Sequence, residues 1–248
     1  MLMRKTFVLL SFLSMCFLAF CFCTPGNQTD DTKIKTIIKN IRNTLTYMHY
    51  RPQIINDSFS EDVFNLYLEK IDPNKRYLLQ SDYDEFKKDY HHLDDYFNNQ
   101  DLRFFHATID TLFQRYKEAK EYSEEILKEP FDFTKDEDFL IGDDAIAYAK
   151  SKAEAKDLWR KYLKYNTLTE LIRLQEDSTK MDMPLVELEK EARENVSETI
   201  SDFFRRQAQL KKDRFLTHYI NSFTEKYDPH TSYFSPDDKD DFDVNISG

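Results

Sequence analysis

The chain contains almost no glycine. Only Gly26, Gly142 and Gly248 occur among its 248 residues. Tight hairpin turns and phosphate-binding loops depend on glycine, because other residues adopt positive φ only at a cost. The sequence therefore excludes the P-loop, the dinucleotide-binding fingerprint and the Gly-x-Ser-x-Gly nucleophile elbow. We expect no bound cofactor and a fold built from helices.

Cysteine and positive charge are also in short supply. Cys16, Cys21 and Cys23 are the only cysteines, so the rest of the chain has no thiol for a disulfide, a metal site or a nucleophile. We expect no metal centre. Acidic residues outnumber Lys and Arg by 46 to 35, which gives a net charge of −11 at pH 7. Nucleic-acid binding needs clustered positive charge, so we expect no nucleic-acid partner.

Residues 1–23 have the order of an export signal. Arg4 and Lys5 precede an apolar stretch from Thr6 to Cys23, and a polar linker, 24–31, follows it. Basic, apolar and then polar is the order of a secretory signal. The apolar stretch is also just long enough to span a bilayer, so an uncleaved anchor stays open, as does lipidation of a cysteine. We expect contact with a membrane only through this segment.

The remaining chain has the apolar spacing of helices. Apolar residues recur every three or four positions between prolines that separate the segments; these prolines are Pro52, Pro73, Pro130, Pro184 and Pro229. A first helix is expected over 34–47 and a long one over 145–174, centred on Trp159. Capping-box spacing predicts helix starts at Ser81-x-x-Asp84 and Thr134-x-x-Glu137. The fold class expected is all-α, a multi-helix bundle of about seven helices with an extended C-terminal tail.

One sequence pattern occurs twice, 156 residues apart. Glu-Lys-Ile-Asp-Pro ends at Pro73, and Glu-Lys-Tyr-Asp-Pro ends at Pro229. Apolar positions upstream and downstream of the two copies also match in register. Residues before proline are disfavoured in the α region, so Asp72 and Asp228 are expected just past the ends of two helices. We interpret the copies as two related structural corners, and convergent helix-stop chemistry is the alternative. The side chains expected to pack after each turn are Tyr77 and Leu78 in the first copy, and Tyr233 and Phe234 in the second.

The second copy carries several groups that are familiar from catalysis. Asp228, His230, Ser232 and Ser235 supply an acid, a base and two hydroxyls within eight residues. A nucleophile and its base must meet at hydrogen-bond distance beside an oxyanion site, and a turn this tight rarely arranges them. The structural interpretation fits better: Asp228 accepts backbone donors at a turn, and the aromatic residues pack.

The string from Tyr227 to Pro236 resembles the signature that closes the N-terminal region of carboxyl-terminal processing proteases, also called tail-specific proteases. Its signature residues are Asp228, Pro229, His230, Thr231, Ser232, Tyr233, Phe234, Ser235 and Pro236. The stretch from Asp72 to Leu79, followed by Ser81 and Asp82, is similar to an earlier corner of the longer members. The resemblance implies a helical N-terminal domain over 32–236. It also implies that 237–248 begins a connection to a PDZ domain and a Ser/Lys protease core.

The resemblance implies a function as well as a fold. The chain is expected to be a helical scaffold that guides substrates or adaptors for an exported, serine-type, periplasmic protease. The expected partners are the PDZ and protease domains and protein substrates or adaptor proteins. The catalytic serine and lysine would lie beyond Gly248, so the chain alone is expected to be inactive and to come from a truncated gene or a split reading frame. A free-standing exported binding protein is the alternative, and the nucleotides after codon 248 distinguish the two.

Overall fold

The computed structural model describes residues 25–142, 146–180, 182–209, 212–236 and 239. These residues form eight α-helices and two short 3-10 helices, and they contain no β-strand. The elements are α1 (Pro25–Tyr47), α2 (Asp57–Ile71), α3 (Gln80–Phe86), η1 (Lys87–Asp89), α4 (Leu93–Asn99), α5 (Arg103–Ile126), α6 (Lys152–Gln175), η2 (Ser178–Lys180), α7 (Leu185–Gln209) and α8 (Lys212–Tyr227). The all-α expectation is confirmed, with one helix more than expected.

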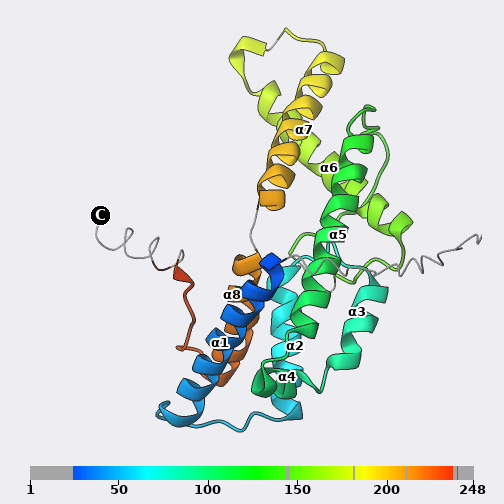
Figure 1. The fold of residues 1–248 in the computed structure, drawn as a ribbon. Coiled ribbons are helices and arrows are strands. Elements are labelled where there is room, and N and C mark those ends of the chain that lie inside the picture. Colours follow the sequence, from blue (N-terminus) through cyan, green and yellow to red (C-terminus); the bar gives the residue numbers. More distant parts are fainter. Residues whose placement is uncertain (1–24, 143–145, 181, 210–211, 237–238, 240–248) are drawn as a thin grey trace, which may run out of the picture.

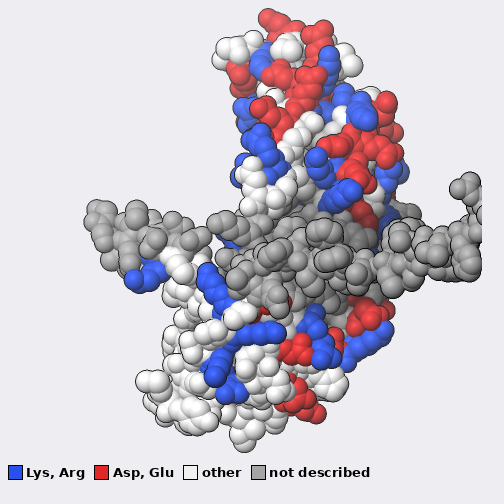
Figure 2. All heavy atoms as spheres, viewed as in Figure 1, with Lys and Arg blue, Asp and Glu red and all other residues white. Residues whose placement is uncertain are grey.

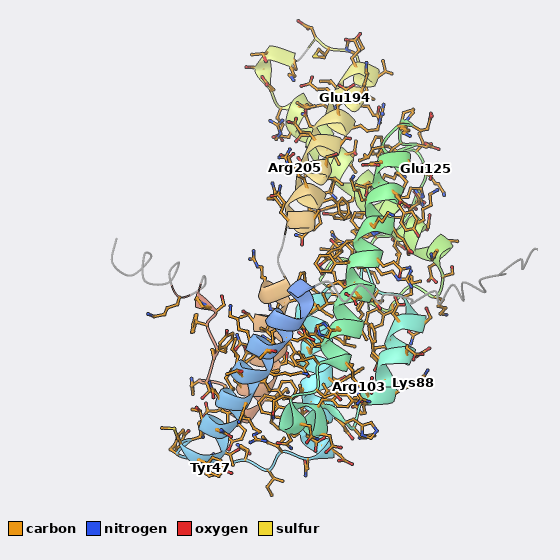
Figure 3. All side chains as sticks on the ribbon, viewed as in Figure 1. Tyr47, Lys88, Arg103, Glu125, Glu194 and Arg205 are labelled. Carbon is orange, nitrogen blue, oxygen red and sulfur yellow. The ribbon has the colours of Figure 1, made fainter. Side chains whose placement is uncertain are left out.

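The helices form an elongated molecule with two lobes that share α5 (Figure 1). One lobe holds α1, α2, α4 and α8 around the first half of α5. The other holds α6 and α7, which pack on each other and on the rest of α5. Figure 3 marks this span: Arg103 at the start of α5 lies beside the first lobe, and Glu125 near its end lies beside the second.

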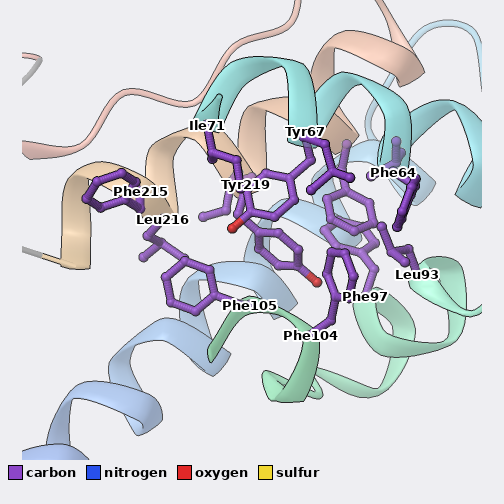
Figure 4. Packing of buried hydrophobic residues seen from close by; sticks show 14 of the residues in the cluster. Phe64, Tyr67, Ile71, Leu93, Phe97, Phe104, Phe105, Phe215, Leu216 and Tyr219 are labelled. Atoms are coloured by element: carbon purple, nitrogen blue, oxygen red, sulfur yellow. The ribbon is translucent and has the colours of Figure 1, made fainter. Parts of the chain in front are cut away.

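The first lobe has a core rich in aromatic side chains. Phe97 and Phe223 stack with ring centroids 4.3 Å apart, and Tyr67 meets Tyr219 edge-on at 5.2 Å. Figure 4 shows the rings of Tyr67, Phe97 and Tyr219 in the space between α2, α8 and the helices around them. Aromatic side chains bury large apolar areas, so the many Phe and Tyr residues of the chain are explained here mainly as core.

The two helices that carry the repeated pattern, α2 and α8, pack directly on each other. Phe59 near the start of α2 contacts Phe223 near the end of α8, whereas Tyr67 near the end of α2 contacts Tyr219. The helices are therefore antiparallel, and the two Asp-Pro corners lie at opposite ends of the pair. A salt bridge of 2.9 Å between Lys70 and Glu225 adds a polar contact across it.

The second lobe has its own core around Trp159. This ring is 1% exposed and packs on Phe204, with centroids 5.7 Å apart. The expected long helix around Trp159 exists as α6, but it begins at Lys152 rather than at 145. Ser151 caps it by accepting a hydrogen bond from the Glu154 amide at 3.2 Å. The residues just before it pair elsewhere, because the Gln80 amide donates to the Ala149 carbonyl at 2.8 Å.

Other helix starts also differ from the expectation. Helix α1 begins at Pro25, so residues 25–31, expected as a polar linker, are its first turns. Helix α3 begins before Ser81, because the Asp82 carboxylate accepts the Leu79 amide at 2.8 Å. None of the described helices is long and apolar enough to cross a bilayer. The predicted signal segment, 1–23, lies outside the described residues, as does nearly all of 237–248.

The spacing of Thr134 and Glu137 predicted a helix start, but no helix begins there. The Glu137 carboxylate instead fastens the segment after α5 to α6, with Arg160 at 3.0 Å and Lys164 at 2.8 Å. The Arg160 guanidinium, followed by the Lys164 and Lys135 ammonium groups, holds the pKa of Glu137 well below its usual value. The folded state therefore favours the ionised carboxylate.

This depressed pKa predicts a pH-dependent role in stability. A group whose pKa falls on folding stabilises the protein above its unfolded pKa, about 4.3 for Glu, and loses that effect as the pH falls further. We expect Glu137→Gln to lower the melting temperature at pH 7 and the difference from the parent protein to shrink below about pH 4. Thermal melts of both proteins from pH 7 to pH 3 measure this difference in melting temperature. Glu124→Gln, at an exposed pair with Lys120, is the control, and a difference that stays constant with pH would contradict the role.

Two buried tyrosines offer a matched test of core polarity. The Tyr219 hydroxyl is buried without a hydrogen-bond partner in the described residues, whereas the Tyr67 hydroxyl lies 3.0 Å from the Thr108 hydroxyl. An unsatisfied buried hydroxyl costs about 1–3 kcal/mol. Tyr219→Phe should therefore raise the free energy of unfolding by about 1 kcal/mol, and Tyr67→Phe should lower it by a similar amount. Urea melts decide this, and a destabilised Tyr219→Phe variant would show that the hydroxyl has a partner.

Candidate functional site

The sequence signature forms a corner at the end of α8. The Asp228 amide donates to the Thr224 carbonyl at 2.9 Å, which closes the helix, and the Asp228 carbonyl accepts the Thr231 amide at 2.9 Å, which makes the turn. Pro229 and His230 are exposed at its tip. The expectation that Asp228 lies just past a helix end is confirmed.

The Asp228 carboxylate is the centre of the corner. It accepts the His230 amide at 2.7 Å and the Tyr50 hydroxyl at 3.1 Å, and the His49 Nε2 atom lies 3.4 Å away. The His230 amide, ahead of the Tyr50 hydroxyl and His49, holds the pKa of Asp228 below its usual value against the effect of burial. The lowered pKa favours the ionised carboxylate, which accepts its hydrogen bonds as in a structural turn.

The corner also fixes the loop that follows α1. The Tyr227 hydroxyl donates to the Leu45 carbonyl at 2.8 Å and accepts the Gln53 amide at 2.9 Å. The Thr231 hydroxyl lies 3.5 Å from His49 Nε2. Two stretches that are nearly 180 residues apart in the sequence are therefore joined, and the corner ties the end of α8 to the connection between α1 and α2.

Tyr233 and Phe234 do not behave alike. The Asn221 side chain accepts the Tyr233 amide at 2.6 Å and donates to its carbonyl at 3.0 Å. This clamp fastens the backbone of Tyr233 to α8. Tyr233 is half-buried against the first core, whereas Phe234 is 51% exposed. The expectation that Phe234 is substantially buried is wrong.

The groups considered for catalysis are not assembled. Ser232 and His230 are exposed, and the histidine ring beside Asp228 belongs to His49 instead. The Ser235 carbonyl accepts the Lys239 amide at 2.9 Å, and Pro236 is exposed. The geometry supports a joint that positions chain segments rather than a nucleophile with its base.

The first corner uses its aspartate differently. Asp72 is 1% exposed, and its carboxylate accepts three successive backbone amides, from Arg76, Tyr77 and Leu78, at 2.9–3.0 Å. Burial raises the pKa of Asp72, against the lowering effect of these amides. The backbone repeats the second corner, because the Asp72 amide donates to the Leu68 carbonyl and its own carbonyl accepts the Lys75 amide.

Tyr77 of the first corner packs against the cores of both lobes, whereas Leu78 belongs to the core of the first lobe. Leu78 is 1% exposed, and Tyr77 packs 4.5 Å from Tyr116 and 5.8 Å from Trp159, between ring centroids. Pro73 is exposed. The two corners share their backbone hydrogen bonds, which both related corners and convergent helix-stop chemistry produce, so the interpretation of two related corners stays a prediction. His49 and Tyr50 were missed because they lie nearly 180 residues before Asp228 in the sequence. Asn221 was missed although it lies only 12 residues before Tyr233.

The comparisons with known proteins agree with this architecture. The sequence-family model described as the tail specific protease N-terminal domain matches residues 41–237. This chain belongs to that family. It is also 30% identical over 210 residues to the tail-specific protease of Haemophilus influenzae, across 84% of this chain and 28% of that protein. The chain thus spans little more than a quarter of that relative, and the match to the domain family ends one residue after the signature.

Proposed function

We propose that the chain is the helical scaffold of an exported, serine-type tail-specific protease, and that it guides substrates or adaptors toward the catalytic part. The observation that carries this is the match to the domain family over 41–237. The two corners support it, because they fasten helices and loops to one another instead of assembling a reaction centre. Export and a periplasmic location are part of the proposal and rest on residues 1–23.

The continuation of the reading frame tests the scaffold role. Transcript sequence beyond codon 248 should encode a PDZ domain and a Ser/Lys core in some frame, and the purified chain should not cleave unfolded or C-terminally tagged proteins. A downstream region without these domains would favour the free-standing binding protein instead. Serine-dependent cleavage that disappears in Ser232→Ala or Ser235→Ala would overturn the assignment of the corner as a joint.

Fractionation of cells tests the export part separately. The chain should be recovered from the periplasm or the outer face of the inner membrane. Deletion of residues 2–23 should leave it in the cytoplasm. Recovery of the intact chain from the cytoplasm would contradict export and would leave the domain assignment unchanged.

A further inference from the structure

Two adjoining cavities lie where the first Asp-Pro corner meets the start of α6. The first, of about 380 Å³, lies between Asn74–Arg76, residues 138–141 and Leu158 of α6. Its lining is largely apolar, and two of its residues, Leu140 and Ile141, are 55% and 59% exposed. The second, of about 640 Å³, shares Lys75, Ile146 and Ala147 with the first and has a more polar lining.

Arg76 supplies a positive charge to the first cavity that no neighbour neutralises closely. Its guanidinium carbon lies 3.7 Å from the Tyr162 ring centroid, and the group forms no salt bridge within the described residues. The carboxylate whose charge acts on it, Asp72, already accepts three backbone amides. A planar guanidinium held against an aromatic face is well placed to pair with a carboxylate through two hydrogen bonds.

The other charged side chains of the cavity are engaged or distant. Lys75 donates to the Ile146 carbonyl at 2.6 Å, and Glu154 accepts the Lys150 amide at 2.7 Å. Lys161 lies 3.9 Å from Asp157, and Asp138 is exposed. Arg76 is thus the half-buried cation best placed to receive an anionic group from outside.

The segment 138–141 offers unpaired backbone at the edge of the cavity. It belongs to no helix, and its amides and carbonyls make no backbone hydrogen bond within the described residues. The segment is irregular rather than part of a sheet, but its amides and carbonyls can hydrogen-bond an extended peptide as the exposed edge of a sheet does. The exposed Leu140 and Ile141 side chains beside it add apolar surface, which marks interaction sites when it gathers in one place.

We propose that this cavity binds an extended peptide segment in which an acidic side chain lies close to a large apolar one. The apolar side chain enters the space beside Leu158, the carboxylate pairs with Arg76, and the peptide backbone runs along 138–141. The peptide continues into the second cavity, because the two share three lining residues. The carboxylate therefore belongs to an internal Asp or Glu rather than to the chain terminus. This inference rests on the substrate-guiding part of the proposed function and names its ligand.

Peptide binding to the purified chain tests the inference. The probe is acetyl-Ser-Leu-Phe-Glu-Leu-Ser-amide, and its matched control carries Gln in place of Glu. Trp159, the only tryptophan, has its ring centroid 6.0 Å from the Arg76 guanidinium carbon, so its emission reports on the site while calorimetry gives the affinity. We expect at least tenfold tighter binding of the Glu peptide. Equal binding of the two peptides, or binding of neither, would overturn the proposal.

Variants and a second pair of probes identify the site and the ligand. Arg76→Ala should remove the preference for Glu, and Leu140→Ser, at an exposed position, should weaken both peptides without affecting the fold. Arg205→Ala, exposed on α7, should change nothing. Two further probes are the Gln peptide with a free C-terminal carboxylate and decanoate. If the first binds as tightly as the Glu peptide, the ligand is a chain end; if decanoate does, the ligand is a fatty acid. Either result would overturn the proposal. Failure of these tests leaves the downstream reading frame, and thus the scaffold role, unaffected.

Discussion

Asp72→Ala is expected to be one of the two most damaging single substitutions in the chain. The carboxylate accepts three successive backbone amides in a buried corner. A buried amide left without an acceptor costs about 1–3 kcal/mol. The substitution should therefore lower the free energy of unfolding by roughly 3 kcal/mol or more, a large share of the ~5–15 kcal/mol that holds a domain together. For a chain of this size, the melting temperature should fall by roughly 6–12 °C.

The second corner provides the matched control for this result. Asp228→Ala removes an acceptor from one backbone amide and one hydroxyl, so its effect on the melting temperature should be clearly smaller. The melting temperature of Asp72→Asn should lie between those of the parent protein and Asp72→Ala. One oxygen of the asparagine side chain still accepts a hydrogen bond, whereas its new amide group faces a backbone donor. Similar melting temperatures for Asp72→Ala and Asp228→Ala would mean that the three amides do not carry the stability of the first corner.

The features predicted best were those set by neighbouring residues. An Asp-Pro pair stops a helix through the steric restriction on the residue before proline, and both corners follow from this local rule. The apolar spacing likewise located the helices, because one buried face imposes it. Because the Trp159 ring is the centre of the second core, the spacing around it located the middle and the end of α6, but not its start.

Tertiary contacts decided the features that were predicted wrongly. The run before α6 looked helical, but Ala149 pairs with the start of α3 and Ser151 caps the helix later. Glu137 had the spacing of a helix cap, but Arg160 and Lys164 bind it from α6. The partners of Asp228 come from the loop after α1. The contacts of Ala149, Glu137 and Asp228 join groups far apart in the sequence, which short-range spacing does not encode. The Ser151 cap is the exception, because its Ser-x-x-Glu spacing to Glu154 is local and could have located the start of α6.

Phe223→Ala is the second substitution expected to have a large effect. The ring is fully buried where α8 meets α2 and α4, stacked on Phe97 at 4.3 Å and edge-on to Tyr219 at 5.1 Å. Truncation of a buried phenylalanine to alanine costs about 3–5 kcal/mol, because it removes apolar burial and leaves a cavity. The melting temperature should fall on the order of 10 °C. Differential scanning calorimetry of the purified chain measures this.

Phe234→Ala is the matched control, and it separates the signature from the core. Phe234 follows Tyr233, whose backbone the Asn221 clamp fastens to α8, and its own ring is half exposed. Its truncation should shift the melting temperature by no more than about 2 °C, since exposed substitutions usually stay within about 0.5 kcal/mol. The prediction is contradicted if Phe234→Ala loses much stability while Phe223→Ala melts close to the parent protein. The contacts that stabilise α8 would then be made by the signature residues rather than by the core. The expected ranking, with Phe223→Ala far less stable than Phe234→Ala, would show that Phe234 contributes little to the stability of this core.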